Sequence, residues 1–428
     1  MSLQPLKSWG NTAEMEVERL TNQQRNGSMH YRMLPGAELH TGKPGEIVRS
    51  LGKGRSFGLE RPRKIVEDLL RQADVRINGD RSWDLRIHND RLFSRLLCHG
   101  SLGLGEAYMD GWWDCERIDE FICRLMKAEL NRRIRSPLEY VGYLEARLCN
   151  KQSRLRAWRI GRDHYDIGDD LYRSMLDDKM IYSCAYWKDA PDLNGAQDAK
   201  LELIARKLGL EPGMRVLDIG CGWGGTAWYL ARNHGVEVTG VTVSRNQASA
   251  ARERCQGLPV DIRLEDYRNL SGRFDRVLSV GMFEHVGYKN YRTYMGTVRD
   301  LLSDDGLFLL HTIGNSRSMI QTEPWLERYI FPGSMLPSSS QLARSFEGFF
   351  LLEDWHNFGI DYDRTLMQWH DNFEKDWPGL AARYDRRFYR MWKYYLLSCA
   401  GSFRARKNQV WQLVLSPTGV EKGYASVR

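Results

Sequence analysis

The sequence predicts a large α/β domain over residues 163–428, preceded by a small α+β domain over residues 62–138. From residue 163 onward, short apolar runs alternate with amphipathic segments, which is typical of a parallel sheet covered by helices. One of these runs leads directly into a glycine-rich loop and a helix. The 428 residues exceed one ordinary domain, and the hydrophobic and charged shares, 42% and 27%, exclude a disordered or fibrous chain.

The N-terminal part of the chain is expected to be less regular than the rest. Residues 1–61 show no sustained period, which predicts a flexible extension, with an alternative translation start as a rival explanation. In the small domain, residues 62–73 have apolar side chains on one helical face, and the Asn-Gly pair at 78–79 lies in an alternating segment that predicts a β-hairpin. Residues 139–162 are interpreted as a basic linker.

The α/β domain shows the clearest alternation of elements. Strands are expected at residues 214–219, 236–243, 259–264, 274–280 and 306–311. Helices are expected before and between them, at residues 196–210, 226–233, 245–255 and 290–302. Residues 349–355 and 410–416 are candidates for two further strands.

The strongest motif is VLDIGCGWGG, at residues 216–225. Gly220, Gly222 and Gly225 form a G-x-G-x-x-G array between a strand and a helix. Such glycines let a ligand lie against bare backbone near a helix N-terminus. Enzymes that bind NAD, FAD or S-adenosylmethionine (SAM) all share this spacing, so the array alone does not choose between them.

Flanking residues favour SAM over a dinucleotide. Asp218 precedes the glycines, where a carboxylate suits the ammonium group of a methionine tail better than a pyrophosphate. The next strand ends in Thr242 without the acid that usually holds an NAD ribose, and Gln247 follows as a polar substitute. Asp266 and Tyr267 come after the third strand, where they could bond and flank an adenine.

Six motifs in order resemble the cyclopropane-fatty-acyl-phospholipid synthase family, whose relatives include the mycolic acid cyclopropane synthases. They are HYDIGDDLYRSMLDDKMIYSCAYW, VLDIGCGWGG, GVTVSRNQ, SVGMFEHVG, LLHTIG and EDWHNFGIDYDRTLMQW. The resemblance runs from about residue 63 to the C-terminus. It implies a class I SAM-dependent methyltransferase fold, which is Rossmann-like, with the small domain binding lipid or forming the contact of a homodimer.

The resemblance implies a two-step reaction on unsaturated acyl chains of membrane phospholipids. The SAM methyl group is transferred to a cis double bond, and the resulting carbocation loses a proton as a cyclopropane ring closes. Such a reaction needs an in-line alkene, an electron-rich dry cavity and a base.

The resemblance also assigns candidate residues. It implies that a bicarbonate or carbonate ion acts as the base and is held by Cys184, Glu284, His311, Ile313 and Tyr362. Cys399 is a further catalytic candidate from a shared region, although alkene methylation requires no enzyme adduct, and His285 is expected only to pack or cap. The SAM candidates are Tyr182, Ser183, Asp218, Gly220, Gly222, Trp223, Thr242, Gln247, Asp266 and Tyr267, with Trp223 expected to close over the methionine portion.

The charge distribution adds a possible partner. Sixty-two lysines and arginines against 55 acids give a formal charge of +7, which selects no partner by itself. Residues 131–162 and 379–409 concentrate basic side chains among apolar and aromatic ones. Each stretch is interpreted either as a solvated basic helix or as a contact with anionic lipid. Together with the lipid-related motifs, the distribution favours peripheral association with an anionic membrane surface.

Other features of the sequence indicate the cellular compartment and exclude some classes of ligand. The eight cysteines include no C-x-x-C pair, and no signal-peptide-like start or membrane-length apolar run is present, so we expect a reduced cytoplasmic protein. No Cys/His spacing suits a metal, and the Pro-Pro pair of amino-methylating DNA enzymes is absent, so neither a metal nor nucleic acid is expected.

Two alternative functions stay open. One is a SAM-dependent methyltransferase that acts on another lipid or small molecule without ring closure. The other is a membrane-binding scaffold that retains an inactive SAM fold. The intact residues Gly220, Gly222, Glu284 and His311 argue against such a loss of activity.

Overall fold

The computed structural model describes residues 60–130, 147 and 168–428. All of them belong to one compact unit of the chain, Ser56–Arg428. The predicted extension at residues 1–61 and the predicted linker at 139–162 lie almost wholly outside the described residues.

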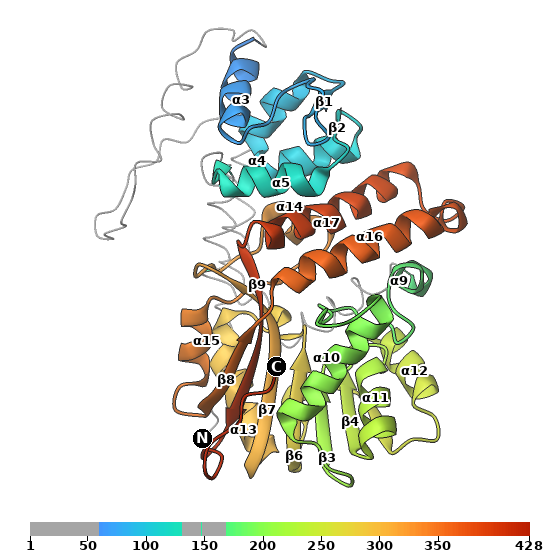
Figure 1. The fold of residues 1–428 in the computed structure, drawn as a ribbon, viewed down its shortest axis with the longest axis vertical. Coiled ribbons are helices and arrows are strands. Elements are labelled where there is room, and N and C mark those ends of the chain that lie inside the picture. The colour runs from blue at the N-terminus through green and yellow to red at the C-terminus, as the bar shows by residue number, and fades with distance from the viewer. Residues whose placement is uncertain (1–59, 131–146, 148–167) are drawn as a thin grey trace, which may run out of the picture. The chain divides into compact units, whose positions relative to one another are not determined.

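The small domain combines helices with a short two-stranded sheet, as predicted (Figure 1). Its elements are α3 (Glu60–Gln72), β1 (Arg86–Ile87), α4 (Arg91–Met109), β2 (Trp113–Asp114) and α5 (Ile118–Lys127). Their apolar faces share one core, in which the side chains of Phe93, Trp113 and Phe121 are fully buried. This burial explains the amphipathic pattern of the helices.

The hairpin predicted around residues 78–79 is wrong. Ile77 and Leu85 form only an isolated parallel bridge, and β1 pairs antiparallel with β2, which follows α4 in the chain. The buried carboxylate of Asp84 accepts the backbone N–H of Arg76 at 2.8 Å and thereby closes the loop. A side chain that satisfies the backbone in this way replaces the ladder that an Asn-Gly hairpin would have formed.

The α/β domain contains a seven-stranded sheet in the order β5-β4-β3-β6-β7-β9-β8. The strands are β3 (Arg215–Ile219), β4 (Glu237–Thr242), β5 (Val260–Leu264), β6 (Phe274–Val280), β7 (Leu302–Asn315), β8 (Leu351–Asn357) and β9 (Asn408–Ser416). All five predicted strands are confirmed, and the two C-terminal candidates are β8 and β9. The sheet is not wholly parallel, because β9 runs antiparallel to both of its neighbours.

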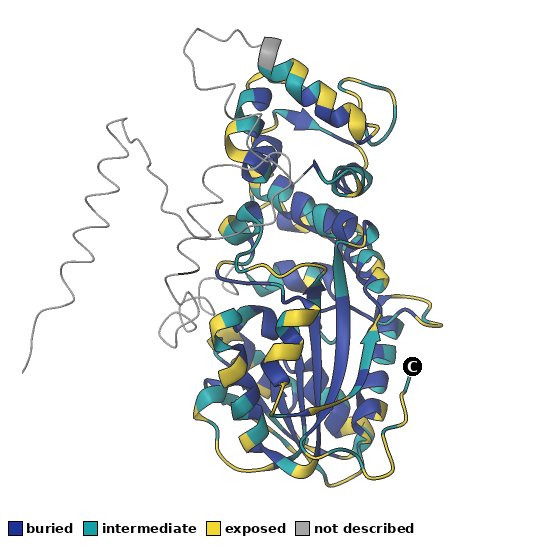
Figure 2. Ribbon diagram, turned by 90° about the vertical axis from the view of Figure 1, so that its left-hand side faces the viewer, coloured by how far each residue is buried: buried dark blue, intermediate teal, exposed yellow. Residues whose placement is uncertain are grey.

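Helices cover both faces of this sheet (Figure 1). They include α9 (Asp169–Met175), α10 (Leu193–Leu208), α11 (Gly225–His234), α12 (Arg245–Arg254), α13 (Tyr291–Leu301), α14 (Pro324–Tyr329) and α15 (Ser339–Phe346), with short 3-10 turns η1 (Tyr267–Asn269), η2 (Phe283–His285) and η3 (Tyr288–Asn290). One core joins the sheet to α10, α11 and α12, and a second core joins its other face to α13 and α15. The strands are accordingly largely buried (Figure 2).

The last two helices are long and pack on each other and on the small domain. They are α16 (Ile360–Leu380) and α17 (Arg386–Arg404), and α17 also contacts α4 and α5. The aromatic rings of Trp392, Tyr394 and Tyr395 are buried, which leaves them unable to rest on a membrane. Several basic side chains of this stretch are held within the protein: Arg390 binds Asp114 at 2.7 Å, Arg404 binds Asp119 and Asp363, and Lys393 binds Glu374. The structure therefore gives α17 a packing role and does not support its interpretation as a lipid-facing helix.

Candidate active site

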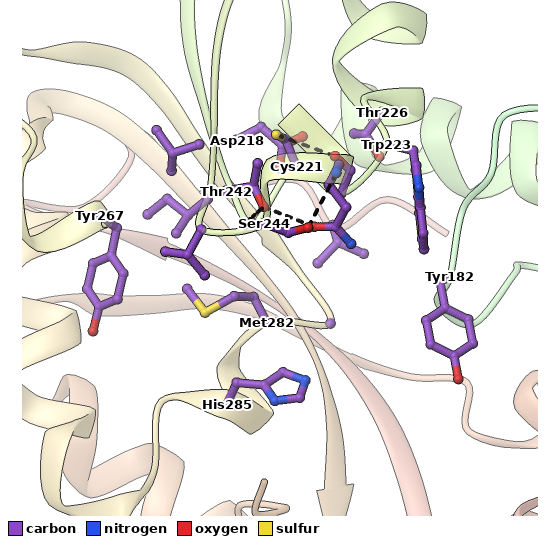
Figure 3. Close-up of a pocket in the computed structure, with 18 of the residues that line it drawn as sticks. Tyr182, Asp218, Cys221, Trp223, Thr226, Thr242, Ser244, Tyr267, Met282 and His285 are labelled. Atoms are coloured by element: carbon purple, nitrogen blue, oxygen red, sulfur yellow. Dashed lines mark hydrogen bonds between the residues drawn. The ribbon is translucent and has the colours of Figure 1, made fainter. Parts of the chain in front are cut away.

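One cavity lies at the carboxyl ends of β3, β4 and β6, beside the glycine loop (Figure 3). All ten residues predicted to bind SAM line it: Tyr182, Ser183, Asp218, Gly220, Gly222, Trp223, Thr242, Gln247, Asp266 and Tyr267. In the close-up, Tyr267 stands at one end of the cavity, and Tyr182 and Trp223 stand at the other. Parallel strands place their loops at one edge, which explains why residues from separate motifs meet here.

The floor of the cavity is bare backbone. Gly220 and Gly222 have φ angles of 87° and 54°, a region that glycine enters without steric cost. A Cβ atom at Gly220 would also lie 2.8 Å from the side chain of Met282, and one at Gly225 would lie 2.2 Å from the Lys179 carbonyl oxygen. The glycine spacing is therefore required by both conformation and space.

Asp218 places a buried carboxyl group at the floor of the cavity. Its side chain is 2% exposed, and burial raises the pKa of its carboxyl group to about 7. Its Oδ2 atom has no hydrogen-bond partner within the described part of the chain. A buried acceptor without a partner is costly, so this atom fits a ligand that brings a cationic or N–H donor group. The residues present therefore fit SAM.

Three of the side chains predicted to bind SAM, those of Asp266, Thr242 and Gln247, already have hydrogen-bond partners within the protein. The carboxylate of Asp266 accepts the Arg268 Nε–H at 2.8 Å, and the Thr242 hydroxyl lies 2.9 Å from Gln247 Oε1. Arg268 also lines the cavity, with its guanidinium 5.5 Å from the ring centroid of Tyr267. Sequence reasoning missed Arg268, although its position two residues after Asp266 is a common spacing for such a local ion pair.

His285 is a second cavity residue that the sequence analysis did not include among the SAM candidates. It was expected only to pack or cap, but it lines the cavity together with Met282 (Figure 3). The ring of His285 also lies 6.2 Å from that of Phe331 in an edge-to-face arrangement. Its position directly after Glu284, in the turn η2 that follows β6, was the feature of the sequence that could have indicated a place at the cavity.

Two polar side chains missed by the sequence analysis hold the loop that carries Tyr182 and Ser183. Lys200, on α10, is fully buried and donates to the Ser183 hydroxyl at 2.7 Å. Gln197, one helical turn earlier, donates to the carbonyl oxygens of Ile181 and Ser183 at 3.2 and 3.0 Å. These bonds fix one wall of the cavity. Burial lowers the pKa of Lys200 to about 8.

The predicted catalytic residues form a separate, buried group behind this cavity, and none of them lines it. Glu284 lies in η2 after β6, and it accepts the backbone N–H of Ile313 on β7 at 2.6 Å. Burial raises the pKa of Glu284 to about 7, and its Oε2 atom has no hydrogen-bond partner among the described residues. His311 lies on the same strand as Ile313, and burial holds the pKa of its imidazole well below the usual value.

Tyr362 and Cys184 approach from α16 and from the loop before α10. Burial raises the pKa of the Tyr362 hydroxyl, and the charges of Cys184 and Glu284 add to this effect. The Cys184 thiol donates to the Ala185 carbonyl oxygen at 3.2 Å, and burial raises its pKa as well. A thiol so protonated fits a packing residue rather than a nucleophile.

Cys399, on α17, does not line the SAM cavity. Burial raises the pKa of its thiol to about 12, with a further contribution from the charge of Glu323. Since the thiolate is the nucleophilic form, this environment does not favour covalent chemistry at Cys399.

Aromatic rings connect the SAM cavity with the buried group. The Tyr182 ring lies 5.2 Å from that of Trp369, and Trp369 lies 5.8 Å from Tyr362. The hydroxyl groups of Tyr182 and Tyr395 are 2.6 Å apart, and Phe403 packs 4.7 Å from Tyr362. Tyrosine and tryptophan rings thus line an electron-rich region from which water is excluded.

Comparison with known proteins establishes the family. The family model described as mycolic acid cyclopropane synthetase matches residues 152–413, which is more than half of the chain. The chain belongs to this family. It is 53% identical over 369 residues to the cyclopropane-fatty-acyl-phospholipid synthase of Escherichia coli (strain K12), covering 85% of this chain and 96% of that protein. It is also 31% identical to the tuberculostearic acid methyltransferase UfaA1 of Mycobacterium tuberculosis, covering 79% of this chain and 84% of that protein.

Solved structures agree with this assignment. The cyclopropane synthase MmaA2 from Mycobacterium tuberculosis is 30% identical, with a TM-score of 0.57, and the match covers 60% of this chain and 97% of that one. The mycolic acid cyclopropane synthase CmaA1 complexed with SAH and CTAB is 31% identical with the same TM-score and coverage. The predicted family, the class I methyltransferase fold and the enzyme class are confirmed.

The described residues also bear on metals, disulfides and membrane spans. No group of three or more His, Cys, Asp or Glu side chains in this part of the chain could hold a metal ion. The cysteines in the described part are free thiols. No helix in the described ranges is long and apolar enough to cross a bilayer.

Proposed function

We propose that this chain transfers the SAM methyl group to a cis double bond of a phospholipid acyl chain and then closes a cyclopropane ring. The observation that carries this function is the 53% identity to the Escherichia coli synthase, which extends over 96% of that protein. The cavity lined by the predicted SAM residues lies beside a buried aromatic core, and this arrangement supports it. The Escherichia coli relative is named for a phospholipid substrate, and we extend that substrate class to this chain.

The cofactor would be held by the cavity floor and its two ends. SAM supplies an electrophilic methyl group on a sulfonium. The Oδ2 atom of Asp218 suits the ammonium of its methionine portion, since that oxygen is buried and has no hydrogen-bond partner among the described residues. Tyr267 and Trp223 stand at opposite ends and flank the cavity, and the glycine backbone allows close approach between them.

The aromatic rings would exclude water and stabilise the cationic intermediate on the lipid. Tyr182, Trp369 and Tyr362 form a chain of ring contacts that begins at the SAM cavity. Aromatic faces attract cations, and this attraction is strongest where water is excluded. The alkene would therefore react in a pocket that favours the charge which develops on it.

Glu284 is central to the final proton transfer. Its raised pKa of about 7 places its ionisation near neutral pH, where a carboxyl group can take part in proton transfer. We propose that Glu284, His311, Ile313, Tyr362 and Cys184 hold a bicarbonate or carbonate ion, which supplies the base. The Oε2 atom of Glu284 lacks a partner in the described part of the chain and fits the protonated side of such an ion.

The proposed function also leads to expectations about membrane association and oligomeric state. We propose that the protein acts as a homodimer at the cytoplasmic surface of an anionic membrane, because its acyl substrate lies in a bilayer. The buried aromatic side of α17 does not supply that contact. Flotation with anionic liposomes at low and high salt tests the association, and no binding at low salt would refute it.

The activity itself is tested by lipid analysis after expression in cells that make unsaturated phospholipids but no cyclopropane lipids. Unsaturated acyl chains should gain the mass of one methylene group, and proton NMR should show cyclopropane ring protons. Unchanged lipids from cells with soluble, SAM-binding protein would refute the proposed function. The Glu284→Gln variant is the matched negative control, since its SAM cavity is intact.

A second function has support of its own. The chain is 32% identical over 271 residues to sphingolipid C9-methyltransferase A of Emericella nidulans, a match that covers 59% of this chain and 52% of that protein. Methyl transfer without ring closure would also add the mass of one methylene group if a chain proton were lost. A mass gain without ring-proton resonances would therefore favour this second function.

A further inference from the structure

Three polar side chains stand in one row across the sheet, next to the proposed reaction centre. Gln412 on β9 pairs directly with His311 on β7 and with His356 on β8. Directly paired residues of neighbouring strands point to the same face of a sheet. The row therefore carries three hydrogen-bonding side chains on one face of the sheet, and the side chain of Gln412 at its centre is fully buried.

A helix places two buried lysines against the same region. Lys200 and Lys207 are seven residues apart on α10 and thus share one helical face, and both are fully buried. Lys207 lies 3.2 Å from Nδ1 of His356 and 3.3 Å from Oδ2 of Asp354. The ring of Phe358 lies 5.6 Å from His311 and 5.0 Å from His356, so it covers both imidazoles.

The donor and acceptor roles in this row follow from the chemistry of the groups. An ammonium group has only donors, so Nδ1 of His356 must accept the hydrogen bond from Lys207. The amide of Gln412 is oriented with its nitrogen 3.3 Å from Nδ1 of His311, and its Oε1 atom has no hydrogen-bond partner among the described residues. In this orientation the amide donates to His311. Nδ1 of His311 therefore accepts, which leaves the proton of the neutral ring on Nε2.

The surrounding charges oppose a second proton on His311. Burial lowers the pKa of His311, and the charges of Lys200, Lys207 and His356 lower it further. The Asp354 carboxylate is not placed to offset them, because it is engaged by Lys207 and by Arg428. The imidazole is therefore neutral at physiological pH.

We propose that Gln412 is a positioning residue that holds His311 as a neutral imidazole with its proton on Nε2. His311 then donates one hydrogen bond to the anion in the buried pocket and does not accept the proton released by ring closure. This inference rests on the proposed function for the role of His311. It leaves Glu284, or an anion held beside it, as the proton acceptor.

The tautomer can be measured without any activity. In protein labelled with 15N-histidine, the His311 signals are assigned by their loss in His311→Asn. We expect the shifts of a neutral ring with the proton on Nε2, unchanged from about pH 6 to about pH 9. A proton on Nδ1, or titration to imidazolium in that range, would overturn the inference. Absence of synthase activity would refute the proposed function but leave this measurement valid.

A substitution tests the consequence for catalysis. Glutamate at position 412 only accepts hydrogen bonds, so Gln412→Glu should move the His311 proton to Nδ1 and favour the imidazolium. We expect kcat to fall about 10- to 100-fold, the pH profile to gain a histidine-like ionisation, and the Kd of SAM to change less than about two-fold. A reversed tautomer with an unchanged kcat would overturn the inference.

A matched control lies on the same strand. Gln409 already uses its Oε1 to accept hydrogen bonds from Asn357 and Trp411, so Gln409→Glu keeps these bonds and should retain wild-type kcat. If Gln412→Glu does not fold, Gln412→Met removes the donor without adding charge. A folded Gln412→Met protein should show a mixture of His311 tautomers and a lower kcat, and a wild-type tautomer and kcat would overturn the inference.

Discussion

The SAM cavity and the buried group of predicted catalytic residues each contain a buried carboxyl group, and we expect the two groups to have different roles. Each contains a carboxyl group whose pKa burial raises to about 7, Asp218 in the cavity and Glu284 in the pocket. Asp218 stands on a floor of glycine backbone made by one continuous segment. Glu284 accepts the Ile313 N–H and is surrounded by side chains from α16, β7 and a distant loop.

This difference suggests separate roles for the two carboxyl groups. Asp218 is buried but lines a cavity that a ligand can enter, so it should control binding. Glu284 is buried and does not line that cavity, so it can exchange a proton without contact with bulk water and should control turnover. Substitutions that affect only one of the two quantities test this division.

The largest expected effect is on turnover by Glu284→Gln. The amide cannot take part in the proton transfer, so we expect kcat to fall about 100- to 10,000-fold while the Kd of SAM stays within about two-fold. Steady-state kinetics and calorimetric titration with SAM measure the two quantities. A large loss of SAM affinity would mean that the pocket and the cavity are not functionally separate.

A related pH dependence follows from the wild-type protein. Because the Glu284 pKa is raised to about 7, its carboxylate form is lost as the pH falls through that value. We expect kcat to decline on the acid side with an apparent pKa near that of Glu284. A kcat that stays flat from about pH 8 to about pH 5.5 would contradict an ionised Glu284 in the reaction.

The next largest effect is on binding by Gly220→Ala. The φ angle of 87° and the contact of 2.8 Å with Met282 oppose any side chain at this position. We expect the Kd of SAM to rise about 10- to 100-fold with the fold retained, as judged by circular dichroism. Gly379→Ala, in α16, has no atom within 4 Å of the added methyl group and serves as the control.

A smaller effect on SAM and a gain in stability are expected for Asp218→Asn. Loss of the carboxylate should weaken SAM about ten-fold. The folded-state pKa of Asp218 lies above its unfolded value, so the ligand-free wild type loses stability as the pH rises from about 4 towards about 7. Asp218→Asn should therefore have the higher Tm at pH 8 and little advantage at pH 4. An equal Tm at pH 8 would show that the carboxylate is already compensated.

The smallest effect on SAM binding is expected for a substitution at Lys200, which holds the wall of the cavity at Ser183. Lys200→Met removes the bond to Ser183 and should raise the KM for SAM about three- to ten-fold. Lys207→Met, on the same face of α10, should lower the Tm through loss of the Asp354 contact and leave that KM unchanged. Equal effects of both variants on KM would contradict a local role of Lys200.

The ten residues predicted to bind SAM line one cavity because the segments that carry them are local parts of the chain. A strand, a glycine array and a helix follow one another along the chain, and the carboxyl ends of parallel strands bring Asp218, Thr242 and Asp266 to one edge. The family motifs supplied the members of the buried pocket. Hydrophobic periodicity was sufficient for the five parallel strands of the large sheet, since a strand buried in a parallel sheet has a continuous apolar pattern.

Side-chain partners could not be predicted in the same way. The pairing of Asp266 with Arg268, the cavity position of His285 and the contact between Lys200 and Ser183 depend on rotamers and on neighbouring elements. The predicted hairpin failed because a buried carboxylate, Asp84, satisfied the loop backbone. In each of these cases, packing brought together groups whose contact the sequence alone did not indicate.

The amino-acid sequence by itself determined the family, the α/β fold and the residues of the SAM cavity. Only the tertiary structure decided the use of the basic, aromatic segment that became α17. The same pattern suits a solvated helix, a membrane-bound helix or a packed one. The carboxylates of Asp114, Asp119 and Asp363, from distant parts of the chain, pair with two of its arginines, Arg390 and Arg404, and its rings Trp392, Tyr394 and Tyr395 are buried. Charge partners so far apart in sequence meet only once the chain has folded.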